Sequence, residues 1–166
     1  RVIVQTAGAG YVIGADASDR VTMRLAPLED EMRHVDRAWG ADGWARQLSS
    51  SQRNALATKY LRIHIFGAAY YRAVAGTWTG EDRLVLSRAT TLILKRAPRA
   101  DRALSIADRR LIDAIVDTST PDRAVSQLAL ARRKFLTPAA LVPRSLGQFL
   151  NREAPLRFMV SSAMVR

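Results

Sequence analysis

The chain has 166 residues, of which 26 are Lys or Arg and 15 are Asp or Glu, so its formal net charge is +11. Hydrophobic residues make up 48% and charged residues 25%, which excludes intrinsic disorder and suffices for one compact unit. The absence of cysteine excludes disulfides and thiolate metal sites. No window reaches the roughly 18 to 20 apolar residues of a membrane span. We therefore expect a soluble protein without a membrane partner, in the cytoplasm or within an assembled particle.

The positive charge is concentrated in the second part of the chain. Residues 1–48 carry six basic and seven acidic residues, whereas residues 49–166 carry 20 basic and eight acidic residues. No acidic residue occurs between Arg46 and Gly80. A surplus of this size creates a field that attracts polyanions.

The first 26 residues predict a β meander. Short β-branched or alternating runs occur at 2–4, 11–13 and 21–25, and they are separated by Gly-rich or polar turn-like stretches. Pro27 ends this region, and residues 27–166 form the basic helical domain. A further alternating run at 156–160 predicts a short C-terminal strand.

Helical periodicity and capping residues divide the second region. Ser105 with Asp108 three residues later resembles a capping box, and Thr120-Pro121-Asp122 is a strong start signal. The predicted helices are 28–39, about 50–75, 79–95, 105–116, 121–135 and 145–151.

The helix over about 50–75 carries the strongest pattern and should be central. Spacings of three and four relate the residues of its main apolar or small stripe, which are Leu56, Tyr60, Ile63, Gly67, Tyr70 and Val74. A second stripe contains Leu61, Ile65 and Ala68. A helix that is apolar on two sides is normally packed by neighbours on both. The expected fold class is therefore α+β but α-rich: a helical bundle around this helix, with a small N-terminal meander and a short C-terminal strand.

The two histidines are the first candidates for chemistry. Glu31 lies three residues before His34, which is half of a carboxylate-bridged metal site, but no second Glu-x-x-His occurs. We expect His34 on a solvated helix face and His64 as a packing residue. The sequence also contains no Gly-x-Ser-x-Gly elbow. We predict no metal, no cofactor and no catalytic residue, so an enzymatic activity is not expected.

One pair of segments resembles ADP-ribosyltransferase toxins. The triplet 70–72 is Tyr-Tyr-Arg, and 46 residues after Arg72 comes 118–120, Thr-Ser-Thr. The resemblance implies an Arg on an early strand, a Ser-Thr-Ser-type segment and a catalytic Glu. The sequence departs from the pattern at its end, because Glu153 is the only acidic residue after Asp122 and position 151 is Asn.

The function expected from the charge is contact with nucleic acid, RNA or DNA, through the phosphate backbone, as a non-catalytic subunit of a larger assembly with other protein subunits. The candidate nucleic-acid-binding residues are the basic residues of two segments, namely Arg96, Arg99, Arg102, Arg109, Arg110, Arg123, Arg133 and Lys134. Two alternatives remain. One is a structural or assembly protein of a phage or secretion machine that binds acidic protein surfaces. The other is a toxin-like effector domain that acts on nucleic acid or nucleotide.

Overall fold

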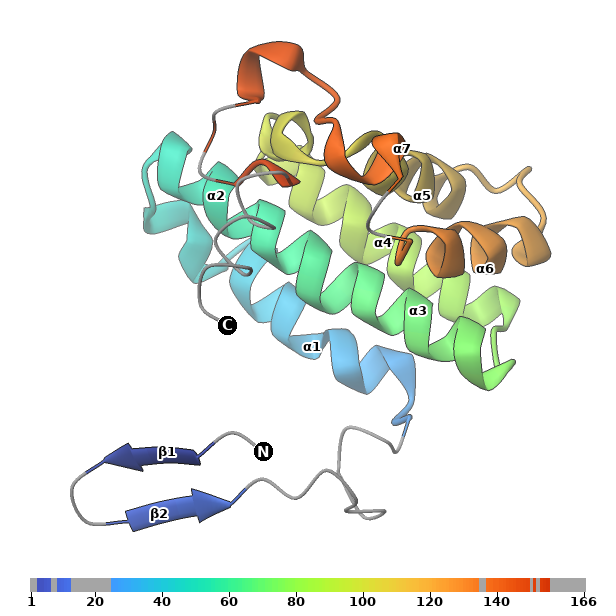
Figure 1. The fold of residues 1–166 in the computed structure, drawn as a ribbon, viewed down its shortest axis with the longest axis horizontal. Helices are drawn as coiled ribbons and strands as arrows, with labels where there is room; N and C mark the ends of the chain where they lie inside the picture. The colour runs from blue at the N-terminus through green and yellow to red at the C-terminus, as the bar shows by residue number, and fades with distance from the viewer. Residues whose placement is uncertain are drawn as a thin grey trace.

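The computed structural model describes residues 3–6, 9–12, 25–134, 137–149, 151 and 153–155, and from Leu25 onward the fold is helical (Figure 1). Two strands precede the helices. In chain order the elements are β1 (Ile3–Thr6), β2 (Ala9–Val12), α1 (Leu28–Trp39), η2 (Trp44–Gln47), α2 (Ser50–Tyr60), η3 (Leu61–Ile65), α3 (Phe66–Ala75), α4 (Gly80–Arg96), η4 (Ala100–Ala103), α5 (Ile106–Val116), α6 (Asp122–Ala131), α7 (Pro138–Leu141) and η5 (Leu146–Gln148).

The expected α+β class is wrong, because the described core is built from helices alone. Strands β1 and β2 pair only with each other, antiparallel, with Ile3 opposite Val12. Every buried residue of the hydrophobic core lies between Leu28 and Ala129. A two-stranded hairpin has too few residues to form a core by itself. Of the expected third strand, only Leu25 belongs to the described residues, and it is not in a strand; the expected strand at 156–160 lies outside them.

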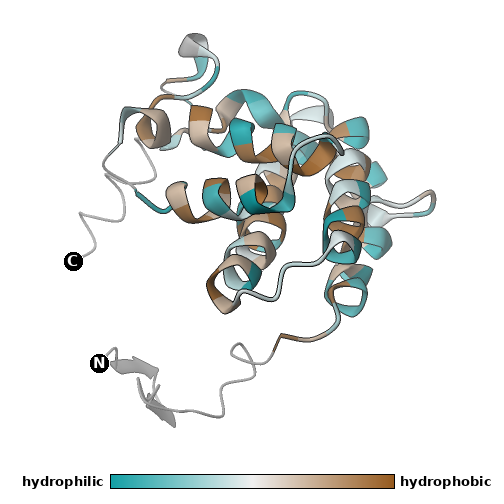
Figure 2. Cartoon of the chain, turned by 90° about the vertical axis from the view of Figure 1, so that its right-hand side faces the viewer, coloured by the Kyte–Doolittle hydropathy of each residue, from teal (hydrophilic) through white to brown (hydrophobic). Residues whose placement is uncertain are grey.

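The helices pack in pairs around α4 and the long helix formed by α2, η3 and α3. Helix α4 contacts α1, η3, α2 and α5, while α6 packs against both α3 and α5 (Figure 1). Hydrophobic and hydrophilic residues alternate along the helices (Figure 2), and α1 is the most clearly two-sided, with Leu28, Met32, Val35, Ala38 and Trp39 buried. No described helix has the length and apolar character needed to cross a membrane.

Side-chain caps start three of the helices. Ser49, Thr79 and Ser105 each accept a hydrogen bond from the backbone N–H three residues later, and the residue at that position bonds back to the cap. These reciprocal bonds satisfy N–H groups that the helix itself leaves free. The predicted capping box at Ser105 and Asp108 is therefore confirmed. The helix after Pro121 ends at Ala131, earlier than the predicted 135.

The long helix runs without a break from Ser50 to Ala75, but its buried side differs from the predicted main stripe. Ile63 is 65% exposed and Val74 is 58% exposed. The predicted second stripe, Leu61, Ile65 and Ala68, is the buried one; Ala57, Leu61, Ile65 and Ala69 are fully buried at a spacing of four, and Phe66 is buried beside them.

A π-helical turn explains why the second predicted stripe, and not the main one, faces the core. In a regular α-helix a repeat of four drifts round the axis by about 40° per step. Here the N–H of Phe66 bonds to the carbonyl of Leu61, five residues back, within the π turn η3. The π turn contains more residues than a turn of α-helix, so residues four apart stay on the same side of the long helix.

This geometry predicts opposite outcomes for two neighbouring substitutions. Leu61→Ala should lower the free energy of unfolding by about 2 to 5 kcal/mol, because it leaves a cavity in the core. Ile63→Ala removes a similar side chain from an exposed site and should change it by no more than about 0.5 kcal/mol. Urea denaturation of both variants measures the difference. Equal losses would contradict the assignment of the buried side.

Candidate functional site

Several of the basic residues are used to hold the helices together. The side chain of Arg72 on α3 is 4% exposed; its guanidinium donates to Glu31 on α1 at 3.2 Å and to Asp82 on α4 at 3.1 Å. It also donates to the carbonyl of Ala26 at 2.8 Å. Arg132 forms an ion pair with Asp108 and lies over the ring of Phe66 at 4.4 Å. Such residues contribute little free positive charge to the surface.

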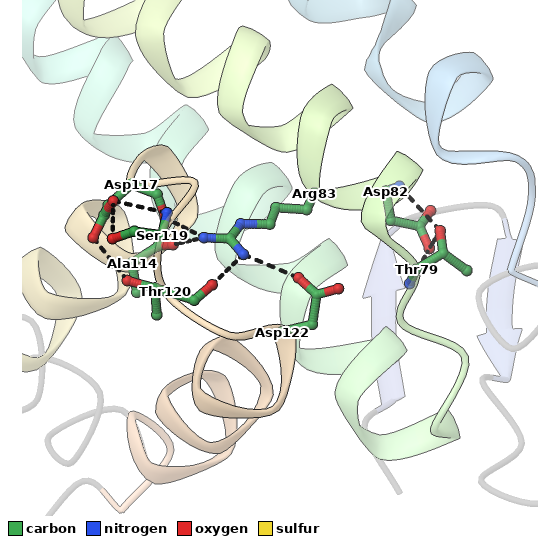
Figure 3. A network of polar contacts seen from close by, with 8 residues as sticks. All are labelled: Thr79, Asp82, Arg83, Ala114, Asp117, Ser119, Thr120 and Asp122. Carbon is green, nitrogen blue, oxygen red and sulfur yellow. Dashed lines mark hydrogen bonds and ion pairs between the residues drawn. The ribbon is translucent and has the colours of Figure 1, made fainter.

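Arg83 is a third such residue, and it holds the loop between α5 and α6 (Figure 3). Its side chain is 9% exposed and forms an ion pair with Asp122 at 3.1 Å. It also donates to the carbonyls of Ala114, Asp117 and Thr120. The carboxylate of Asp117 accepts hydrogen bonds from Ser119 and Thr120, and these bonds lower the pKa of Asp117.

These contacts bear on the resemblance to ADP-ribosyltransferase toxins. Arg72 lies on helix α3 and not on a strand, and its guanidinium is occupied by two carboxylates. Ser119 and Thr120 belong to the loop tied to Asp117 and Arg83 (Figure 3). The resemblance therefore does not extend to the fold around these residues.

The predicted basic residues have different environments. Arg109 is occupied by ion pairs with Asp101 at 2.8 Å and Asp113 at 2.9 Å. Arg133 is exposed and lies over the ring of Tyr70 at 4.1 Å. Arg96 is half-buried, and its Nε has no hydrogen-bond partner among the described residues. The remaining candidates are exposed and have no ion-pair partner in the described part of the chain; they are Arg99, Arg102, Arg110, Arg123 and Lys134.

Two of these residues, Arg99 and Arg102, line a polar cavity of about 720 Å³ together with Lys59. The cavity lies between one side of α2, the connector that contains η4, and the residues Gln148, Asn151 and Glu153. Its lining residues are Ser50, Ser51, Asn54, Ala55, Thr58, Lys59, Arg99, Arg102, Ala103, Gln148, Asn151 and Glu153. We call it the basic cavity.

The walls of the basic cavity are joined by hydrogen bonds. The amide of Asn54 donates to the carbonyl of Ser50 at 2.7 Å, and its oxygen accepts the N–H of Arg99 at 3.0 Å. The buried hydroxyl of Thr58 lies 2.9 Å from the carbonyls of both Asn54 and Ala100. The connector is thereby fixed against α2, so the position of the Arg99 backbone is defined.

The acidic member of the lining is partly neutralised. The Glu153 carboxylate lies 3.8 Å from the Arg62 guanidinium, which also donates to the Glu153 carbonyl at 2.6 Å and the Ala103 carbonyl at 3.4 Å. Lys59, Arg99 and Arg102 form no ion pair with any described residue. The cavity therefore carries a positive potential.

Sequence reasoning missed Lys59 and the polar residues around it. The useful signal was the acid-free stretch from Arg46 to Gly80, which contains Lys59. The candidates on α6 lie elsewhere, because α6 packs on α3 whereas η4 packs on α2. The two predicted groups of basic residues thus belong to opposite halves of the long helix.

The two histidines meet although they are 30 residues apart in the sequence. Their ring centroids lie 4.1 Å apart, with the Tyr60 ring 5.0 Å from His64 and 5.7 Å from His34. Burial, and next the neighbouring His34, lower the pKa of His64. The expected solvated position of His34 is wrong, since it is half-buried and its Nε2 is inaccessible and without a partner among the described residues.

The described residues contain no group of three or more histidines or carboxylates arranged to hold a metal ion.

Comparison of the chain with family models, with curated proteins and with solved structures finds no match.

The lowered pKa of His64 makes stability depend on pH. Because the pKa of His64 is lower in the folded chain, the unfolded chain binds more protons as the pH falls through the ordinary histidine range near about 6.5. Between roughly pH 7.5 and 5.5 the free energy of unfolding should decrease more steeply for the parent than for His64→Gln. Denaturant melts at several pH values measure both slopes. Identical slopes would show that His64 titrates alike in the two states.

Proposed function

We propose that the protein binds nucleic acid through its phosphate backbone at the basic cavity. The observation that supports this is the convergence of Lys59, Arg99 and Arg102 on one cavity of about 720 Å³, without an ion-pair partner among the described residues. Unpaired cations around a concave surface concentrate polyanions, because the low-dielectric walls focus the field.

The remaining lining chemistry favours phosphate over bases. Ser50, Ser51, Asn54 and Asn151 supply hydroxyl and amide donors, which together with Arg and Lys make most contacts to phosphate oxygens. The two arginines can each grip a phosphate with paired N–H groups. Among the described residues no aromatic side chain lines this cavity, so they offer no surface on which a base could stack. Recognition here should not depend on sequence.

The surplus of basic residues on other surfaces would extend this contact. Arg110, Arg123, Arg133 and Lys134 are exposed on α5, on α6 and just after it. They would add to the long-range attraction without defining a site. An acidic protein surface is the competing partner, and it is distinguished by the experiment below.

The salt dependence of binding tests the proposal. Fluorescence anisotropy would follow labelled single-stranded and duplex oligonucleotides over a range of salt concentrations. Each phosphate contact contributes about 0.7 to 0.9 to the log–log slope. Combined replacement of Lys59, Arg99 and Arg102 by Ala should therefore reduce the slope by roughly two to three.

The matched control removes the same charge elsewhere. Lys95, Arg110 and Arg123 are exposed, line none of the basic cavity and have no ion-pair partner among the described residues. Their combined replacement by Ala should reduce the slope by less than the cavity variant does. Equal reductions would point to a diffuse field instead of a site. A parent protein that fails to bind at low salt would favour the acidic-protein partner.

A further inference from the structure

A second cavity, of about 380 Å³, lies between α1 with the preceding Leu25 and the η3–α3 part of the long helix, and it has a different chemistry. It shares no lining residue with the basic cavity. Its lining residues are Leu25, Glu31, Met32, His34, Ile63, His64, Gly67, Ala68, Tyr71 and Arg72. We call it the neutral cavity. Its volume lies near the lower end of the range of about 300 to 1,000 Å³ found for small-molecule sites.

The neutral cavity has no free charge. Glu31 and Arg72, its only charged lining residues, form an ion pair at 3.2 Å, and Arg72 also pairs with Asp82. Burial and the neighbouring His34 both lower the pKa of His64, which disfavours its charged form. A charged ligand would lose its hydration here without gaining a partner of opposite charge. The occupant should therefore be uncharged.

The His64 imidazole supplies unused hydrogen-bonding groups. Nε2 of His34 is buried and has no partner among the described residues, and His64 likewise makes no hydrogen bond with them. A neutral imidazole has one N–H donor and one nitrogen acceptor. His64 therefore suits a ligand whose edge carries both donors and acceptors.

The entrance is apolar and open. Ile63 lies one helical turn before Gly67 and Tyr71 lies one turn after it, and their side chains are 65% and 46% exposed. A Cβ added at Gly67 would meet no heavy atom within 4 Å. Exposed apolar side chains around an opening offer contact area to the faces of a flat ring.

We infer that the neutral cavity binds an uncharged planar heteroaromatic ring of the nucleobase type. Ile63, Met32 and Tyr71 would contact the ring, and His64 would hydrogen-bond to its polar edge. The ring could come from a free nucleoside or from an unpaired base of a single strand. This inference does not depend on the basic cavity.

Titration with nucleosides tests the site directly. The chain contains only two histidines, so the imidazole signals in ¹H–¹⁵N NMR report on this cavity alone. Adenosine, guanosine, cytidine and uridine would each be titrated, and at least one should shift both imidazoles saturably. Indole, which has an apolar ring but only a donor on its edge, should bind more weakly. An absence of saturable shifts with all four nucleosides, or tighter binding of indole, would overturn the inference.

Gly67→Leu provides a variant that should fold and yet block the entrance. The site around Gly67 is open, and leucine favours a helix more than glycine does. Nucleoside affinity should fall by about tenfold or more, the size of a lost ring contact. Leu84→Ala, at an exposed apolar position on α4 outside this cavity, is the control and should leave affinity unchanged. Unchanged affinity in Gly67→Leu, with normal unfolding, would overturn the inference.

The source of the ring is resolved by competition. A poly-dT or poly-dA oligonucleotide that displaces the nucleoside, and does so less well in Gly67→Leu, would show that a strand base enters the cavity. Binding of free nucleosides without displacement would assign the site to the free compounds. The variant lacking Lys59, Arg99 and Arg102 should retain nucleoside binding, so a failure of the basic cavity can be distinguished from a failure here.

Discussion

Two buried guanidinium groups, those of Arg72 and Arg83, are the constraint on which the arrangement of the helices depends. Each lies where three segments meet: Arg72 joins α3 to α1 and to the start of α4, and Arg83 joins α4 to α5 and α6. A buried cation without partners is very costly, so the carboxylates and carbonyls around each arginine must be held in place. For Arg83 this requirement determines the path of the loop from Ala114 to Asp122 (Figure 3).

This use of arginine divides the net charge into two classes. Arg72, Arg83, Arg109 and Arg132 are paired with carboxylates inside or between helices. Lys59, Arg99 and Arg102 instead surround the basic cavity and have no such partner among the described residues. The formal net charge of +11 cannot distinguish the two classes, because both contribute equally to it. Only the positions of the acidic residues in space separate them.

The sequence predicted the helices better than their packing. Local signals sufficed where the determinant is local: the capping box at Ser105 and Asp108 and the helix over 28–39 agree with the structure. The expected burial of Ile63 failed because the π turn at 61–65 changes which side faces the core. The pairing of His34 with His64 was unpredictable for a similar reason, since it depends on how α1 meets the long helix. The expected α+β class was wrong because the β propensity of short runs can indicate strands, but it does not show whether those strands form a sheet against which the helices pack.

The long helix that contains the π turn lines both cavities. Lys59 lines the basic cavity, and Ile63, four residues later, lines the neutral one. Residues four apart on a helix are neighbours, about 6 Å apart along its axis. Regular α-helix through this region would change which residues face the core, and with them the position of His64 opposite His34. The same irregular turn that keeps Leu61 and Ile65 in the core thus leaves Ile63 at the surface. The long helix thus contributes residues to both cavities, Lys59 to the cationic one and Ile63 to the uncharged one.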